Sequence, residues 1–110
     1  HRDTTVGMST RAELLIEKLT NLRRYLQERV PKDQFDSFCK EYRLSDVETL
    51  RDPQAWLSWF AYWSSTLAPL TSREKQFSYL SRFRQLDGVD GEVRERICLY
   101  ISCVNDLMRS

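Results

Sequence analysis

The stretch from Pro53 to Leu70 constrains the fold of this chain most strongly. It reads PQAWLSWFAYWSSTLAPL and contains all three tryptophans of the protein but no charged residue. Its large apolar residues recur at the spacing of one helix face: Trp56, Phe60, Trp63 and Leu67. Further apolar residues on its other sides are typical of a helix that is buried nearly all round. We therefore expect residues 53–68 to form a central helix, with Trp56, Phe60 and Trp63 in the core.

An uncharged stretch of this length must also be compared with a membrane-spanning helix. Such a helix requires about 20 consecutive apolar residues. Here Pro53 and Pro69 bracket the segment, and it is interrupted by the polar residues Gln54, Ser58, Ser64, Ser65 and Thr66. The pattern therefore favours a core helix, and we expect no membrane span.

The segments on either side of this stretch also have the pattern of helices. Capping-box sequences begin at Thr10, Ser45 and Thr71, each with a glutamate three residues later, and Asp52 and Asp90 are further N-cap candidates. The predicted helices cover residues 11–30, 32–42, 45–51, 53–68, 71–86 and 91–108.

These features together predict the fold class and the domain organisation. Few glycines and no runs of β-branched residues argue against a sheet. The expected fold is all-α, a single compact antiparallel bundle of five or six helices around the central Trp-rich helix. Residues 1–8 lack helical periodicity, so we expect a disordered lead-in or tag there and a single helical domain over residues 9–110.

Charge and cysteine content restrict the classes of partner and compartment. The net charge is +1, so no overall positive field indicates nucleic acid. Three cysteines without regular spacing, Cys39, Cys98 and Cys103, make a poor disulfide framework. Free thiols in a reducing compartment are the better interpretation, and we expect an intracellular protein, cytoplasmic or nuclear.

No motif for catalysis is present in the sequence. A nucleophilic cysteine requires a base, and the only histidine is His1, in the expected lead-in. The glycines do not form a phosphate-binding pattern, and the cysteines lack the spacing of zinc ligands. Acidic pairs such as Glu13 with Glu17 are common on solvated helix faces. We therefore expect a non-catalytic protein without a metal or cofactor.

A first candidate contact site lies on the predicted helix of residues 71–86. It combines an aromatic ring with basic side chains: Arg73, Phe77 and Arg84. These residues lie within about 60° of one another around the helix axis, and an aromatic ring flanked by arginines can hold an acidic segment. The alternative is a core phenylalanine whose neighbouring arginines extend into water.

A second candidate site consists of apolar residues away from the predicted inner faces: Leu14, Tyr25 and Leu99. They form a patch only if the first and last helices are neighbours, which the sequence alone does not establish. We rank the arginine-aromatic site above this apolar one, because it combines charge and an aromatic ring on one helix face.

The run YLQERVPKDQFDSFCKEYR, two helices joined at Pro31, resembles the first hairpin of paired-amphipathic-helix and harmonin-N-type interaction domains. Six helices in a chain of this length also resemble the arrangement of death-fold domains. No binding residue is transferred from either resemblance.

The expected function is therefore a protein–protein interaction module, such as an adaptor or regulatory domain. It would bind an acidic or amphipathic helical segment of another protein through one of the two candidate sites. The alternative is a nucleic-acid-binding helical domain that uses the arginines of residues 11–30 and 71–86.

Overall fold

The computed structural model describes residues 2–82 and 90–110, and all the regular secondary structure in these residues is helical. In chain order the elements are α1 (Arg2–Arg29), α2 (Lys32–Glu41), the 3₁₀-helix η1 (Val47–Arg51), α3 (Pro53–Thr66), α4 (Arg73–Leu80) and α5 (Gly91–Arg109). The predicted all-α class is thus confirmed for the described part of the chain.

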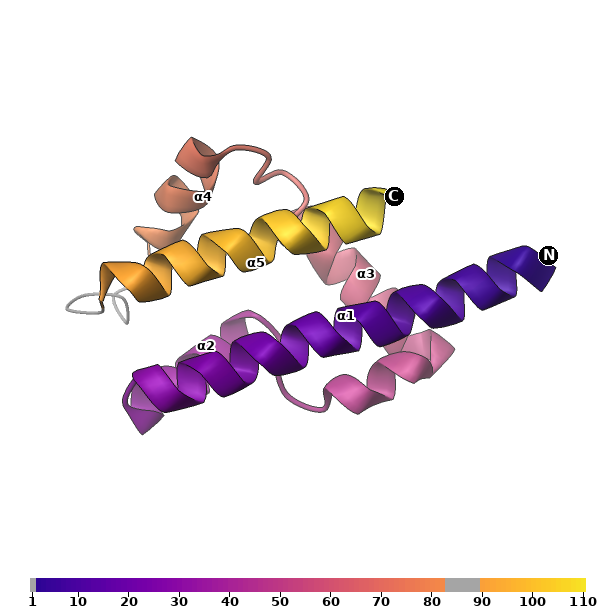
Figure 1. Cartoon of the computed structure of the whole chain (residues 1–110), viewed down its shortest axis with the longest axis horizontal. Coiled ribbons are helices and arrows are strands. Elements are labelled where there is room, and N and C mark those ends of the chain that lie inside the picture. The colour runs from indigo at the N-terminus through magenta and orange to yellow at the C-terminus, as the bar shows by residue number, and fades with distance from the viewer. Residues whose placement is uncertain (1, 83–89) are drawn as a thin grey trace.

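The first and last helices form the centre of the molecule. They run side by side in opposite directions, with α4 against α5 and with α2 and η1 against α1 (Figure 1). The side chains buried between them are aliphatic: Leu15, Leu19, Leu22 and Leu26 from α1 and Ile97, Ile101 and Val104 from α5. Their positions repeat every three or four residues, so each helix presents one continuous apolar face to the other.

The structure corrects the expected position of the Trp-rich helix. In α3, Trp59 and Trp63 are buried, but Phe60 is 43% exposed and Leu57 is 61% exposed. The prediction that Phe60 belongs to the core is wrong, and a central Trp-rich helix is not confirmed. The reason is that α3 packs through one side only, since the long apolar faces of α1 and α5 already fill the centre.

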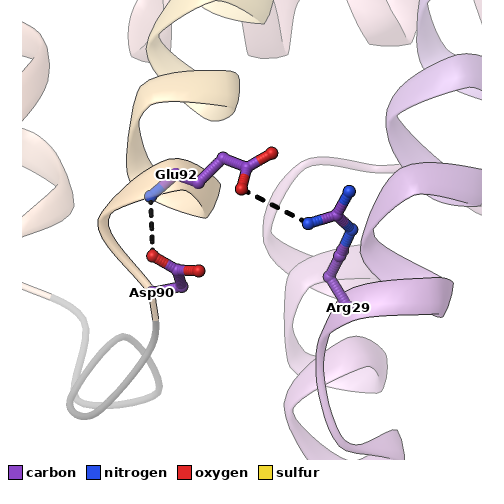
Figure 2. Close-up of polar contacts among 3 residues, drawn as sticks. All are labelled: Arg29, Asp90 and Glu92. Atoms are coloured by element: carbon purple, nitrogen blue, oxygen red, sulfur yellow. Dashed lines mark hydrogen bonds and ion pairs between the residues drawn. The ribbon is translucent and has the colours of Figure 1, made fainter.

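The predicted helix caps are confirmed only in part. Thr10 lies inside α1, the N-cap of η1 is Asp46 and not Ser45, and Asp52 makes no side-chain capping bond. Pro31 separates α1 from α2. The Asp90 carboxylate caps α5 by accepting a hydrogen bond from the Glu92 backbone N–H at 3.1 Å (Figure 2). The cap of α4 is Ser72, which accepts from the Lys75 N–H at 3.2 Å, one residue after the predicted capping position.

Two predicted boundaries differ from the structure or lie partly outside it. Helix α1 begins at Arg2, so the backbone of residues 2–8 is helical where the sequence predicts a disordered lead-in. The division into a lead-in and a domain stays a prediction. Helix α4 begins at Arg73 and ends at Leu80, and residues 83–86 of the predicted 71–86 helix lie outside the described residues.

An exposed ion pair attaches η1 to α1. Arg51 donates from Nε to Glu13 Oε2 at 2.5 Å and from Nη2 to Glu13 Oε1 at 2.9 Å. Such two-point contact between arginine and carboxylate is shorter and more directional than a single hydrogen bond. The hydrogen bond from Arg51 therefore lowers the pKa of the Glu13 carboxyl.

We expect this ion pair to give a small, pH-dependent contribution to stability. Because the folded pKa of Glu13 is lowered, the contribution is present above the unfolded pKa and is lost as pH falls through the folded pKa. Arg51→Gln should raise the Glu13 pKa towards its ordinary value in an NMR titration of the carboxyl group. Arg24→Gln, at an exposed arginine elsewhere on α1, should leave it unchanged. An identical Glu13 midpoint in wild type and Arg51→Gln would contradict the ion pair.

Candidate interaction surface

A surface groove of about 510 Å³ lies across α5, between α1 and α4. Its lining includes three of the six predicted contact residues, Tyr25, Arg73 and Leu99, together with Glu95 and Arg96. We call it the α1/α4/α5 groove. It joins one member of the predicted arginine-aromatic site to two members of the predicted apolar site, which the sequence treats as separate.

The α1 wall of the groove is an aromatic ring held between two arginines. The guanidinium carbon of Arg96 lies 4.7 Å from the centroid of the Tyr25 ring, and that of Arg29 lies 5.1 Å from it. Arg29 also pairs with Glu92 at 3.4 Å, across the gap between α1 and α5 (Figure 2). Tyr25 is therefore fixed in position by cation–π contacts from its own helix and from α5.

The α4 wall of the groove contains Arg73, whose charge already has a partner. Its guanidinium pairs with both carboxylate oxygens of Glu95 on α5 and lies 4.9 Å from the centroid of the Phe77 ring. Arg73 and Phe77 thus lie together. Phe77, however, is half-buried and packs against the core, which favours the alternative of a core phenylalanine. Arg84 lies outside the described residues.

Two exposed leucines lie in or near the groove. Leu99 is 57% exposed on α5, and Leu14, which lies outside the groove on α1, is 42% exposed. The condition for the predicted apolar patch, that the first and last helices are neighbours, is met by the packing of α1 on α5.

Contacts across the two helices define their register. Arg11 donates to the Ser110 backbone oxygen at 2.6 Å, and Arg96 lies over Tyr25. The same step of 14 residues separates Arg11 from Tyr25 and Ser110 from Arg96, as expected for antiparallel neighbours. This register places half-buried Leu107 opposite Leu14 and places Leu99 level with Leu22. Leu107, which is not among the predicted contact residues, thus lies beside Leu14. We call the line along which α1 and α5 meet, with Leu14 and Leu107 on it, the α1–α5 seam.

Three arginines of the nucleic-acid alternative, Arg23, Arg29 and Arg73, do not lie together on one face of the described structure. Arg23 donates to the Leu44 backbone oxygen at 3.0 Å, on the α2 side of α1, whereas Arg29 and Arg73 pair with carboxylates of α5 on the groove side. The single concentrated positive surface that nucleic acid requires is therefore not formed by these three side chains.

The groove also contains a cysteine, Cys98, which is buried. Burial raises the pKa of its thiol, so the reactive thiolate form is disfavoured near neutral pH. Among the described residues, no three of the side chains that commonly bind metals (His, Cys, Asp or Glu) come together as a ligand group. None of the helices described combines the length and the apolar character needed to cross a bilayer.

Comparison of the chain with family models, with curated proteins and with solved structures gives no match.

Proposed function

We propose that this chain is a non-catalytic helical module that binds an amphipathic helix of another protein along the α1–α5 seam and the α1/α4/α5 groove. The observation that carries the proposal is the position of Leu99, a largely exposed leucine in a groove whose walls carry a fixed aromatic ring and several arginines. Interfaces are enriched in aromatic residues and arginine around an apolar centre.

The spacing of the exposed leucines suits a helical ligand. In the register of α1 and α5, Leu99 is level with Leu22, which is eight residues from Leu14 on α1. Eight residues of helix span about 12 Å. A ligand helix has apolar residues at nearly that separation when they lie seven or eight positions apart, so its spacing matches that of the two leucines along the helix axes.

The charges around the seam suit a ligand with acidic flanks. Arg29 and Arg73 are held by Glu92 and Glu95 in exposed ion pairs, and exposed pairs of this kind contribute only about 0–1 kcal/mol. An acidic side chain of a partner can therefore replace either glutamate at little cost. Arg96, stacked on Tyr25, presents a third guanidinium at the same edge.

The proposal predicts that Leu99→Glu removes the partner without unfolding the protein. A carboxylate in the α1/α4/α5 groove would be desolvated on binding and would repel acidic flanks, so the affinity should fall more than tenfold, about 1.4 kcal/mol. The matched control is Leu57→Glu, because Leu57 is exposed to a similar extent on the distant helix α3.

The measurement is affinity capture with each variant, followed by titration of a peptide from the captured protein in a fluorescence assay. A protein retained by Leu57→Glu and lost by Leu99→Glu supports the proposal, provided that far-UV circular dichroism is unchanged. Equal capture by both variants contradicts it. Binding to generic DNA or RNA with a steep dependence on salt would instead favour the nucleic-acid alternative.

A further inference from the structure

The outer side of α3 is an exposed surface without charge. Leu57, Phe60, Ala61 and Ser64 recur at helical spacing and are all exposed. No residue of α3, from Pro53 to Thr66, carries a charge. The Phe60 ring lies 5.5 Å from the Trp63 ring, centroid to centroid, so its position is set by a buried neighbour before any partner arrives. We call these four residues the α3 outer face.

Opposite charges lie at the two ends of this face. Asp52 precedes α3, is exposed, and makes no side-chain capping bond to the helix that it begins. At the other end, Arg109 of α5 donates from Nη2 to the Ala68 backbone oxygen at 2.7 Å, and its guanidinium lies 5.5 Å from the Trp63 ring centroid. The surface is thus negative beyond one end and positive beyond the other, and the four residues between them carry no charge. Arg43, which donates to Ser58 Oγ at 3.3 Å, lies on an adjacent side of α3.

We propose that the α3 outer face pairs with the same face of a second copy of this chain in an antiparallel, two-fold symmetric contact. The absence of charge permits self-pairing, because a charged face repels a copy of itself. A symmetric contact joins one patch to the same patch. With the axis between Phe60 and Ala61, Phe60 of each copy lies opposite Ala61 of the other.

The same arrangement places Leu57 opposite Ser64, so each large side chain meets a small one, as close packing requires. It also brings Asp52 of each copy to the level of Pro69, beside the Arg109 that binds the Ala68 carbonyl. Antiparallel α3 helices further place the positive N-terminal end of each helix dipole beside the negative end of the other. A parallel pairing would oppose like charges at both ends, which is why we infer the antiparallel one.

The expected association is weak and depends on concentration. Stable interfaces bury about 800 Å² per partner, and a contact based on one 14-residue helix is at the small end of that range. Sedimentation equilibrium of the whole chain, from about 10 μM to about 1 mM, should show the mass rising from 13.1 kDa towards twice that value. A monomer over the entire range overturns the proposal.

Variants separate this contact from the partner-binding surface proposed above. Leu57→Glu should hold the chain monomeric, because two carboxylates would be desolvated close to the axis, whereas Leu99→Glu should associate as wild type does. Loss of association in Leu99→Glu with retention in Leu57→Glu would overturn the α3 contact. The two proposals therefore fail independently, since Leu99→Glu tests the partner and Leu57→Glu tests the dimer.

A charge exchange tests the direction of pairing. Asp52→Lys alone should weaken association several-fold, because it opposes Arg109 of the second copy. The double variant Asp52→Lys with Arg109→Glu restores opposite charges across the contact and should recover association close to that of wild type. Both variants are compared at equal helicity by circular dichroism. Further weakening in the double variant would overturn the antiparallel arrangement.

Discussion

Replacement of Trp63 by alanine is expected to lower the free energy of unfolding by about 3–5 kcal/mol, a large part of the stability of a small domain. The indole of Trp63 is 7% exposed, and its Nε1–H donates to Asn105 Oδ1 at 2.7 Å inside the protein. Truncation removes the apolar contacts of the ring, leaves a cavity and leaves the Asn105 oxygen without its donor.

The matched control for this prediction is Phe60→Ala, a truncation of another aromatic residue on the same helix. Because Phe60 is 43% exposed, much of its ring already contacts water, and we expect a loss of only about 1 kcal/mol. Urea denaturation followed by circular dichroism measures both changes. If the two truncations are equally destabilising, α3 does not pack through the Trp63 side.

Helix positions and inner faces were the part of the fold that local sequence rules could predict. In the last helix, Val93, Ile97 and Ile101 recur every four residues in the sequence, and all three are buried in α5. These predictions succeed because helical periodicity and capping depend on residues within one or two turns. The Asp90 cap of α5 has the same local origin.

The position of α3 could not be predicted in this way, because a lack of charge does not determine burial. Which helix occupies the centre depends on how much apolar face each helix offers to all the others. Helix α1 supplies a longer continuous face, from Leu15 to Leu26, than α3 does. The uncharged side of α3 that suggested burial is therefore left as a surface carrying Leu57 and Phe60.

In the candidate site, contacts within one helix could be predicted from the sequence, whereas contacts between helices could not. Arg73 and Phe77 are four residues apart on one helix, so their contact could be predicted from spacing. The pairing of Arg73 with Glu95 and the stacking of Arg96 on Tyr25 depend on the register of α5 against other helices. No sequence spacing encodes that register, so the sequence could not predict that Arg73 shares one groove with Tyr25 and Leu99.

The burial of one polar residue, Asn105, could also have been predicted from the sequence. Asn105 follows Ile97 and Ile101 at intervals of four along the inner face of α5. A polar side chain on an otherwise apolar face requires hydrogen-bond partners when it is buried. Asn105 is 6% exposed, and its Nδ2 donates to the backbone oxygens of Leu67 at 3.1 Å and Leu70 at 3.2 Å.

Asn105→Ala is therefore expected to lower the free energy of unfolding by about 1–3 kcal/mol, the cost of one buried group left without a partner. That group is the Trp63 indole N–H. The two carbonyls that Asn105 also binds each keep one donor, because Leu67 O accepts from the Leu70 backbone N–H at 3.0 Å and Leu70 O accepts from Gln76 Nε2 at 3.2 Å.

A double-mutant cycle with Trp63→Phe isolates the indole–amide bond. Phenylalanine removes the N–H donor but retains an aromatic ring, so the losses from Trp63→Phe and Asn105→Ala should not add, and the pair should be coupled by about 0.5–3 kcal/mol. Asp106→Ala, at the exposed neighbour of Asn105 on α5, is the control and should change stability by less than about 0.5 kcal/mol. If Asn105→Ala unfolds at the same urea concentration as Asp106→Ala, Asn105 does not join the end of α3 to α5. Asn105 would then have no structural role in positioning Trp63.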